Sequence, residues 1–201
     1  MGTNKVVVTD EARLSYPHLF RPAPDLQGNP CYSANLLMDA DGVKKLKAIW
    51  DEVVTEEFGE PNPPGLRPFL SKNPAEDKGW VKSGDQKIEM AKPEKRPQLE
   101  YLRGLYVVPI KAAPERKPKI VDQNKQEIMD VSELQGGDYV RAVLEMSAYT
   151  DKFQRPQVSV RVVVVQKTRD GERFGGGVSP NEALDLLDGG TSSASLDDLG
   201  L

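Results

Sequence analysis

The chain has 201 residues, a formal net charge of −4, 38% apolar residues and 29% charged residues, which suffices for one ordinary domain with its own core. No apolar run approaches the roughly 20 residues of a membrane helix, and the first residues lack the features of a signal peptide. Because Cys31 is the single cysteine, a disulfide framework is excluded, and we expect a cytoplasmic protein that is not bound to a membrane.

The first third of the chain predicts strands followed by one long helix. We expect broken β structure over Lys5–Val8 and Ala12–Tyr16, ended by Pro17, and then a proline-rich loop over residues 17–30. Cys31–Met38 is typical of a strand. The helix begins at Asp39 or Asp41, ends at Gly59, and repeats apolar residues at helical spacing. These apolar residues are expected to pack in the core: Val43, Leu46, Ile49, Trp50, Val53, Val54 and Phe58.

Residues 60–97 are rich in proline, glycine and charge, which predicts a long loop insertion, with short strands at Trp80–Lys82 and Gln86–Met90. Leu99–Lys111 is strand-like, and Gly104 is expected to form a bulge in it.

A hairpin is predicted from Ile120–Asp122 and Glu127–Asp130, and a turn at Gly136-Gly137. The two best strands of the chain follow, over Tyr139–Tyr149 and Gln157–Lys167, and a basic and aromatic loop joins them.

This order of elements favours a mainly β fold, namely an OB-type antiparallel barrel with one amphipathic helix and long loop insertions. The barrel domain is expected to cover residues 1–178, with its insertion at 60–97. Residues 179–201 would form a short helix at Pro180–Leu187 and a flexible acidic tail.

Charge is distributed unevenly along the chain. Every Lys and Arg lies at or before Arg173, so residues 179–201 contain acids without any base, whereas residues 92–119 and 151–173 are rich in bases. A locally positive surface on a near-neutral body with an anionic end is therefore plausible.

The sequence offers no constellation for catalysis. His18, the single histidine, stands alone in a proline-rich loop, so no Ser-His-Asp candidate stands out. A zinc site would need carboxylates as its other ligands, and none has the usual spacing. The glycine run at 175–177 lacks the Lys-Ser/Thr of phosphate-binding loops, and no cluster of Asp and Glu indicates a magnesium site. We therefore expect no enzyme, no cofactor and no metal.

Binding chemistry fits better, because aromatic residues repeatedly stand next to bases in the sequence. General binders of single strands stack bases on aromatic rings and hold phosphates with Lys and Arg. Trp80 and Phe153 are the strongest candidates, since their loops are polar. The full set of candidate single-stranded-DNA contacts is Tyr16, Phe20, Arg21, Tyr32, Lys78, Trp80, Lys82, Tyr101, Arg103, Tyr149, Lys152, Phe153, Arg155 and Arg161.

The acidic end predicts a second kind of partner. Within it, Leu196, Asp197, Asp198, Leu199 and Leu201 combine apolar and negative side chains in a polar, small-residue context. A solubilising end is the alternative interpretation. As a docking segment, it would contact other proteins.

Three segments of the chain resemble, in matching order, the phage-encoded single-stranded-DNA-binding proteins with an OB fold and an acidic C-terminus. They are ARLSYPHLF with NPCYSANLLM, then KPKIVDQNKQEIMD, and finally GGDYVRAVLEMSAY with SVRVVVVQKTRDGERFGGG. The tail departs from the common pattern by ending in Leu201 rather than in an aromatic residue.

The resemblance implies sequence-independent binding of single-stranded DNA in the cytoplasm of the infected host, during replication, recombination or repair, without catalysis. It also implies that the tail contacts phage or host replication and recombination proteins. A protein–protein adaptor or virion component on the same barrel is the alternative, and a DNA-processing nuclease is a third possibility. A homodimer stays open.

Overall fold

The structure is a computed structural model and describes residues 3–71 and 78–174. The expected helix at Pro180–Leu187 and the tail residues from Leu196 to Leu201 lie outside the described residues. Within them the chain is mainly β, and no helix is long and apolar enough to cross a membrane.

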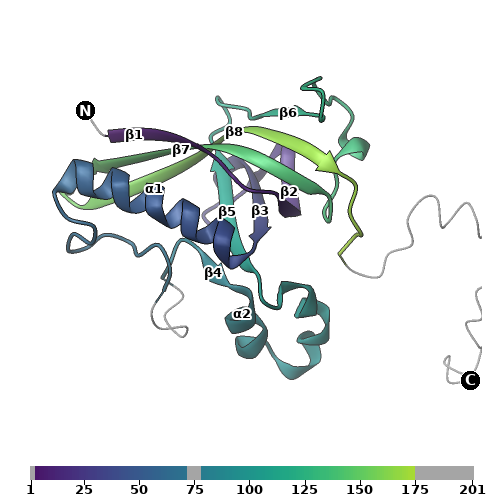
Figure 1. Cartoon of the computed structure of the whole chain (residues 1–201), viewed down its shortest axis with the longest axis horizontal. Coiled ribbons are helices and arrows are strands. Elements are labelled where there is room, and N and C mark those ends of the chain that lie inside the picture. Colours follow the sequence, from purple (N-terminus) through teal and green to yellow (C-terminus); the bar gives the residue numbers. More distant parts are fainter. Residues whose placement is uncertain (1–2, 72–77, 175–201) are drawn as a thin grey trace, which may run out of the picture.

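Five strands are paired into a ring (Figure 1). These are β2 (Ala12–Pro24), β3 (Pro30–Met38), β5 (Tyr106–Ala112), β7 (Tyr139–Thr150) and β8 (Pro156–Arg169). Their pairings run β7–β2–β3–β5–β8 and return through β7–β8. All are antiparallel except β5–β8, where Lys111 and Arg161 form a single parallel pair.

Three shorter strands extend this ring. Strand β1 (Thr3–Val8) pairs with β7, β4 (Lys82–Ser83) with β5, and β6 (Lys119–Val121) with β8. The predicted hairpin around residues 123–125 is confirmed in its first arm, whereas the second arm is reduced to a bridge between Val121 and Glu127.

The predicted long helix is confirmed as α1 (Ala40–Phe58), which packs along β1 and β7 (Figure 1). The Asp39 side chain accepts a hydrogen bond from the Gly42 backbone N–H, and Gly59 ends the helix in the left-handed conformation with φ 78°. Its buried apolar side chains include Trp50, as expected, and Phe58 packs partly buried against the same core.

Strand β2 corrects the expectation of a loop after Pro17. The strand continues to Pro24, and the connecting turn is confined to residues 25–29. Its register to β3 shifts between Ser15 and His18, and again between His18 and Ala23. Pro17 and Pro22 are tolerated because they lie in these two interruptions of the ladder, and Pro24 is the last residue of the strand.

The insertion also differs from its prediction. Gly84–Met90 forms a short helix, α2, where a strand was expected over Gln86–Met90; the Ser83 side chain caps it. A short 3-10 turn over Pro93–Lys95 follows, and residues Pro97–Leu102 form a second turn, η3, so that β5 begins only at Tyr106. Gly104 has φ +69° between η3 and β5 and is no bulge within a strand. Figure 1 shows α2 and these turns projecting from the end of the barrel beside β4 and β5.

Trp80, a candidate DNA contact because its loop is polar, is buried in the core in this structure. Its side chain is 7% exposed and stacks on Trp50, with ring centroids 5.5 Å or less from both Trp50 and Phe69. The indole N–H donates a hydrogen bond of 3.1 Å to the Pro109 carbonyl oxygen. The polar composition of the loop hid this role because the aromatic partners of Trp80, Trp50 and Phe69, are distant from it in the sequence.

Candidate nucleic-acid interface

The outer face of β2, β3 and β5 carries a row of polar and aromatic side chains. Strand β3 alternates, with Tyr32, Ala34 and Leu36 buried in the core, while Cys31, Ser33 and Asn35 lie on the outer face. Pairing places His18 of β2 opposite Ser33, and Ser33 opposite Lys111 of β5. The sheet therefore offers a band of small and polar side chains that runs across three strands.

Tyr16 stands out on this face because its backbone is in the left-handed region, with φ 47°. It occupies the irregularity of β2 between Ser15 and His18, and its side chain is 68% exposed. A bulky residue in this conformation is uncommon and such strain clusters at functional sites. The bulge directs a tyrosine ring outward from the middle of the sheet.

Three adjoining hollows cross this face, and we call them together the sheet groove. The first, about 360 Å³, lies between Tyr16 and the α2–η3 region and is lined there by Lys87, Met90 and Tyr101. The second, about 350 Å³, shares Tyr16 and Asn35 with the first. Cys31, Ser33 and Lys111 also line it, together with the turn at Asp25-Leu26.

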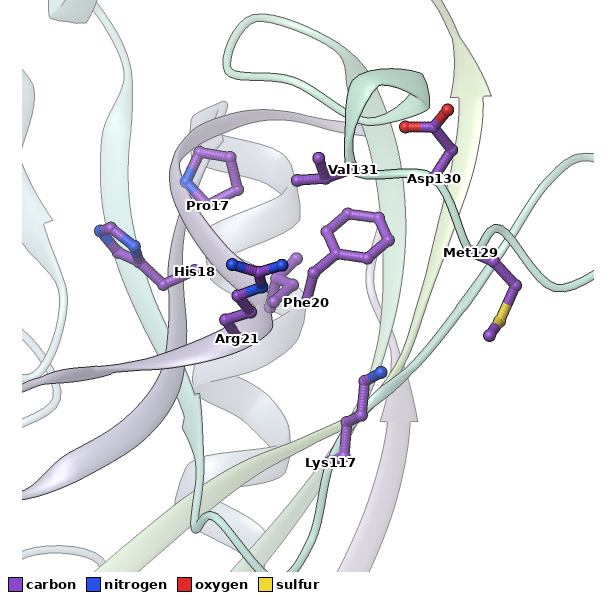
Figure 2. Close-up of a pocket in the computed structure, with 9 residues that line it drawn as sticks. Pro17, His18, Phe20, Arg21, Lys117, Met129, Asp130 and Val131 are labelled. Carbon is purple, nitrogen blue, oxygen red and sulfur yellow. The ribbon is translucent and has the colours of Figure 1, made fainter.

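The third hollow, about 590 Å³, shares His18 with the second and lies between β2 and the segment 129–131. Figure 2 shows Phe20 and Arg21 of β2 facing Val131, with Lys117 on the opposite side of the opening. Met129 and Val131 are largely exposed apolar side chains. An apolar wall with two bases at its rim suits a flat ring attached to an anionic group.

The bases of the sheet groove are available for an anion. Arg21, Lys87, Lys111 and Lys117 have no ion pair with any residue of the described ranges. By contrast, bases elsewhere on the barrel, such as Lys5, Lys45 and Arg169, are paired with carboxylates.

Two carboxylates at the groove's rim are already engaged. The backbone N–H groups of Asn29 and Gln27 donate to Asp25 and lower its pKa. Ser132 does the same for Asp130 through its N–H and hydroxyl. Both acids therefore stay ionised, but their charge is shared with backbone donors of their own turns.

A family model described as "Enterobacter phage Enc34, ssDNA-binding protein" matches residues 5–195. The chain belongs to this family. Two solved structures of the bacteriophage Enc34 single-stranded DNA-binding protein are similar in fold. One, in complex with ssDNA, has 23% identity, a TM-score of 0.57, and coverage of 85% of this chain and 89% of that chain.

The other has 24% identity and a TM-score of 0.55, with 90% of each chain covered. These neighbours and the ring of strands confirm the predicted OB-type fold. No curated protein sequence matches the chain. Among the described residues, no group of His, Cys, Asp and Glu is arranged to hold a metal ion.

Four of the residues predicted from the sequence line the sheet groove: Tyr16, Phe20, Arg21 and Tyr101. Burial raises the pKa of Tyr101, and the neighbouring Tyr16 hydroxyl adds to this effect, which keeps the phenol neutral. Tyr32 is 8% exposed on the inner face of β3 and joins Trp80 in the core. Neither ring is open to a base in this structure.

A second group gathers at the tip of the β7–β8 hairpin. Phe153 is 64% exposed, and the cationic groups of Lys152 and Arg155 each lie 5.0 Å from its ring centroid. Asp151 holds this loop by accepting hydrogen bonds from the Arg155 and Phe153 backbone N–H groups and from the Arg155 side chain. Tyr149 is exposed at the end of β7 beside this tip. None of these residues lines the sheet groove.

The remaining predicted bases are dispersed. Arg103 pairs with Glu100, and Arg161 pairs with Glu145 on the neighbouring strand. Lys82 lies half-buried in β4, and Lys78 is exposed at the start of the second described range.

Sequence reasoning missed much of the groove, including Ser33, Asn35, Lys87, Lys111 and Lys117. The alternation of small polar residues at Cys31, Ser33 and Asn35 was the available signal.

Proposed function

We propose that this chain binds single-stranded DNA in the sheet groove without reading its sequence. The proposal is carried by the combination of exposed Tyr16 with four bases that line the adjoining hollows and have no ion pair to the described residues, namely Arg21, Lys87, Lys111 and Lys117. Stacked bases on aromatic rings and phosphates beside Lys and Arg are the general requirements for such binding. Membership of the Enc34 family supports this proposal.

The finer parts of the proposal follow from the same chemistry. The barrel, residues 1–178, would protect single strands during phage replication, recombination and repair, in the host cytoplasm and without catalysis. Lys152 and Phe153 at the hairpin tip, with Tyr149 and Arg155, would add a second contact to a strand. Groove contacts to backbone phosphates and to ring faces carry no base identity, so little sequence preference is expected.

Alkylation of Cys31 tests where the strand lies. This thiol lines the middle of the sheet groove and is the single cysteine of the chain, so a maleimide reagent modifies one defined position. We expect saturating oligo-dT to slow the modification several-fold, because bound DNA covers the thiol.

The matched control carries Cys31→Ser together with Lys44→Cys. Lys44 is exposed on α1 and does not line the groove, so DNA should leave its modification rate unchanged. Equal modification of Cys31 with and without bound oligo-dT, under conditions where binding is shown independently, would exclude the groove as the DNA path.

The acidic tail is proposed to dock replication and recombination proteins and to compete weakly with DNA. Support comes from its composition and from the position of Phe174, the last described residue, which stacks on the groove residue Tyr101. Deleting residues 190–201 should tighten DNA binding modestly at low salt, since the acids at 197 and 198 compete with phosphates at high effective concentration.

The gain should shrink as salt screens the competition. The same deletion should abolish pull-down of those partner proteins from infected cells. A truncated protein with unchanged affinity and unchanged partners would reduce the tail to a solubilising end.

A further inference from the structure

The segment after β8 folds back across the end of the barrel, and we call residues 170–174 the C-terminal clasp. Its Gly171 N–H donates to the Asp138 carboxylate at 3.2 Å. The Arg13 guanidinium donates to the Glu172 carbonyl oxygen at 2.5 Å and to the Gly137 carbonyl oxygen at 3.3 Å. Backbone atoms of the clasp are thereby fixed to β2 and to the turn before β7.

The backbones of the clasp and of this turn approach each other so closely that only glycine fits at the contact. A Cβ atom on Gly137, which has φ +106°, would collide with the Glu172 carbonyl, and one on Gly171 would collide with the Gly137 carbonyl. Asp138 is buried and forms a 3.1 Å ion pair with Lys167 of β8. These contacts fix the position of the clasp backbone on the barrel, and they thereby fix the position of Phe174.

At that place Phe174 stacks on Tyr101. The ring centroids are 4.4 Å apart with an interplanar angle of 28°, and the Arg13 guanidinium lies 4.2 Å from the Phe174 centroid on the same stack. Offset aromatic pairs and cation–π contacts of this geometry are attractive. Tyr101 lines the sheet groove, whereas Phe174 does not, so Phe174 covers a part of the tyrosine that the groove leaves free.

Tyr101 needs such support because its own element is weak. It lies in η3, a 3-10 turn of six residues whose one buried residue is Leu102. The small core beneath it consists of Leu37, Ile88, Leu102 and Val107, with Phe174 packed at its edge. Tyr101 packs at the edge of this small core and its hydroxyl interacts with Ser15 and Tyr16, while Phe174 supplies the aromatic contact to its ring.

We propose that Phe174 is a positioning residue for DNA binding: stacked on Tyr101 and contacted by the Arg13 guanidinium, it holds the Tyr101 ring in the orientation that the groove presents to a base. This inference rests on the proposed function. It makes the clasp part of the binding unit, so the domain needed for full affinity extends through Phe174.

The test uses the full chain with single substitutions at Phe174, and oligo-dT affinity measured by fluorescence anisotropy. Phe174→Ala should weaken binding about threefold to tenfold, the affinity equivalent of one aromatic pair. Phe174→Leu, which keeps an apolar side chain but no stacking plane, should weaken it similarly. Phe174→Tyr should bind as the unchanged protein does. Thermal unfolding of each variant identifies any loss that is merely loss of fold.

A double-mutant cycle with Tyr101→Ala separates positioning from direct contact. In the Tyr101→Ala background, Phe174→Ala should have no further effect on affinity, because the residue it positions is gone. Additive losses would overturn the inference, since Phe174 would then contact DNA itself. Full affinity of folded Phe174→Ala and Phe174→Leu would overturn it too. If Phe174 proves not to position Tyr101 but Tyr16→Ala weakens binding, the proposed function still holds. If Tyr16→Ala and Tyr101→Ala both bind DNA normally, the sheet groove is not the DNA-binding site.

Discussion

Replacing Trp80 with alanine is expected to lower the free energy of unfolding by about 3–5 kcal/mol, the usual cost of removing a buried large aromatic side chain. The substitution removes a ring that stacks on Trp50 at 5.4 Å and meets Phe69 edge-on at 5.5 Å. It also leaves the Pro109 carbonyl oxygen without the indole donor at 3.1 Å. Urea denaturation followed by circular dichroism measures the loss.

Trp80→Phe is the matched variant, because it keeps a ring in the cluster and removes mainly the hydrogen bond and part of the volume. Its loss of unfolding free energy should be clearly smaller than that of Trp80→Ala.

The burial of Trp80 also predicts the fluorescence response to DNA. Both tryptophans, Trp50 and Trp80, are in the core, so saturating oligo-dT should change tryptophan emission little. Strong quenching by DNA, or a Trp80→Ala variant as stable as the unchanged protein, would contradict the burial of Trp80 in the core.

The elements that the sequence predicted correctly are those whose periodicity is uninterrupted. The helix over residues 40–58 has a capping aspartate, an apolar stripe and a terminal glycine, and each signal is local. Strand β8 carries a run of β-branched residues and β7 alternates buried with more exposed side chains, and the two form the most extensive pairing of the sheet. Their signals required no knowledge of distant neighbours.

The prolines of β2 are typical of a loop, so the sequence predicts an end of this strand at Pro17 although the strand runs to Pro24. The strand survives since its pairing to β3 is irregular around Pro17 and sparse between His18 and Ala23, so few backbone donors are missed there. The register of a partner strand decides this, and register cannot be derived from the prolines themselves. The short helix α2 was misjudged for a related reason, because seven residues give too little periodicity to separate helix from strand.

The site shows the same division between local and tertiary information. Pairing bases with nearby aromatics in the sequence identified Tyr16 and Arg21, because both belong to β2 and face the groove together. The method also selected Trp80 and Tyr32, whose rings point into the core. It could not find Lys111, which faces the groove only because β5 pairs with β3 at Ser33.

Affinity for oligo-dT is expected to fall about 50-fold between 50 and 200 mM salt. The sheet groove offers four bases without ion pairs to the described residues, and each phosphate neutralised on a single strand contributes about −0.7 to the slope of log affinity against log salt. Four contacts give a slope near −2.8, and counter-ion release is the physical cause. Fluorescence anisotropy titrations across a salt series measure it.

The variant Lys111→Gln tests whether this one lysine neutralises a phosphate. Lys111 lies at the centre of the groove opposite Ser33, so removing its charge should reduce the slope to about −2.1. Lys44→Gln removes an equally exposed base from α1, where Asp41 pairs with it at 3.2 Å, and should leave the slope unchanged. If both substitutions reduce the slope alike, or if Lys111→Gln leaves it at its original value, the phosphates do not follow the groove across β2, β3 and β5. Lys111 lines the second hollow, which shares Tyr16 and Asn35 with the first and His18 with the third, so a strand that occupies all three hollows runs past this base.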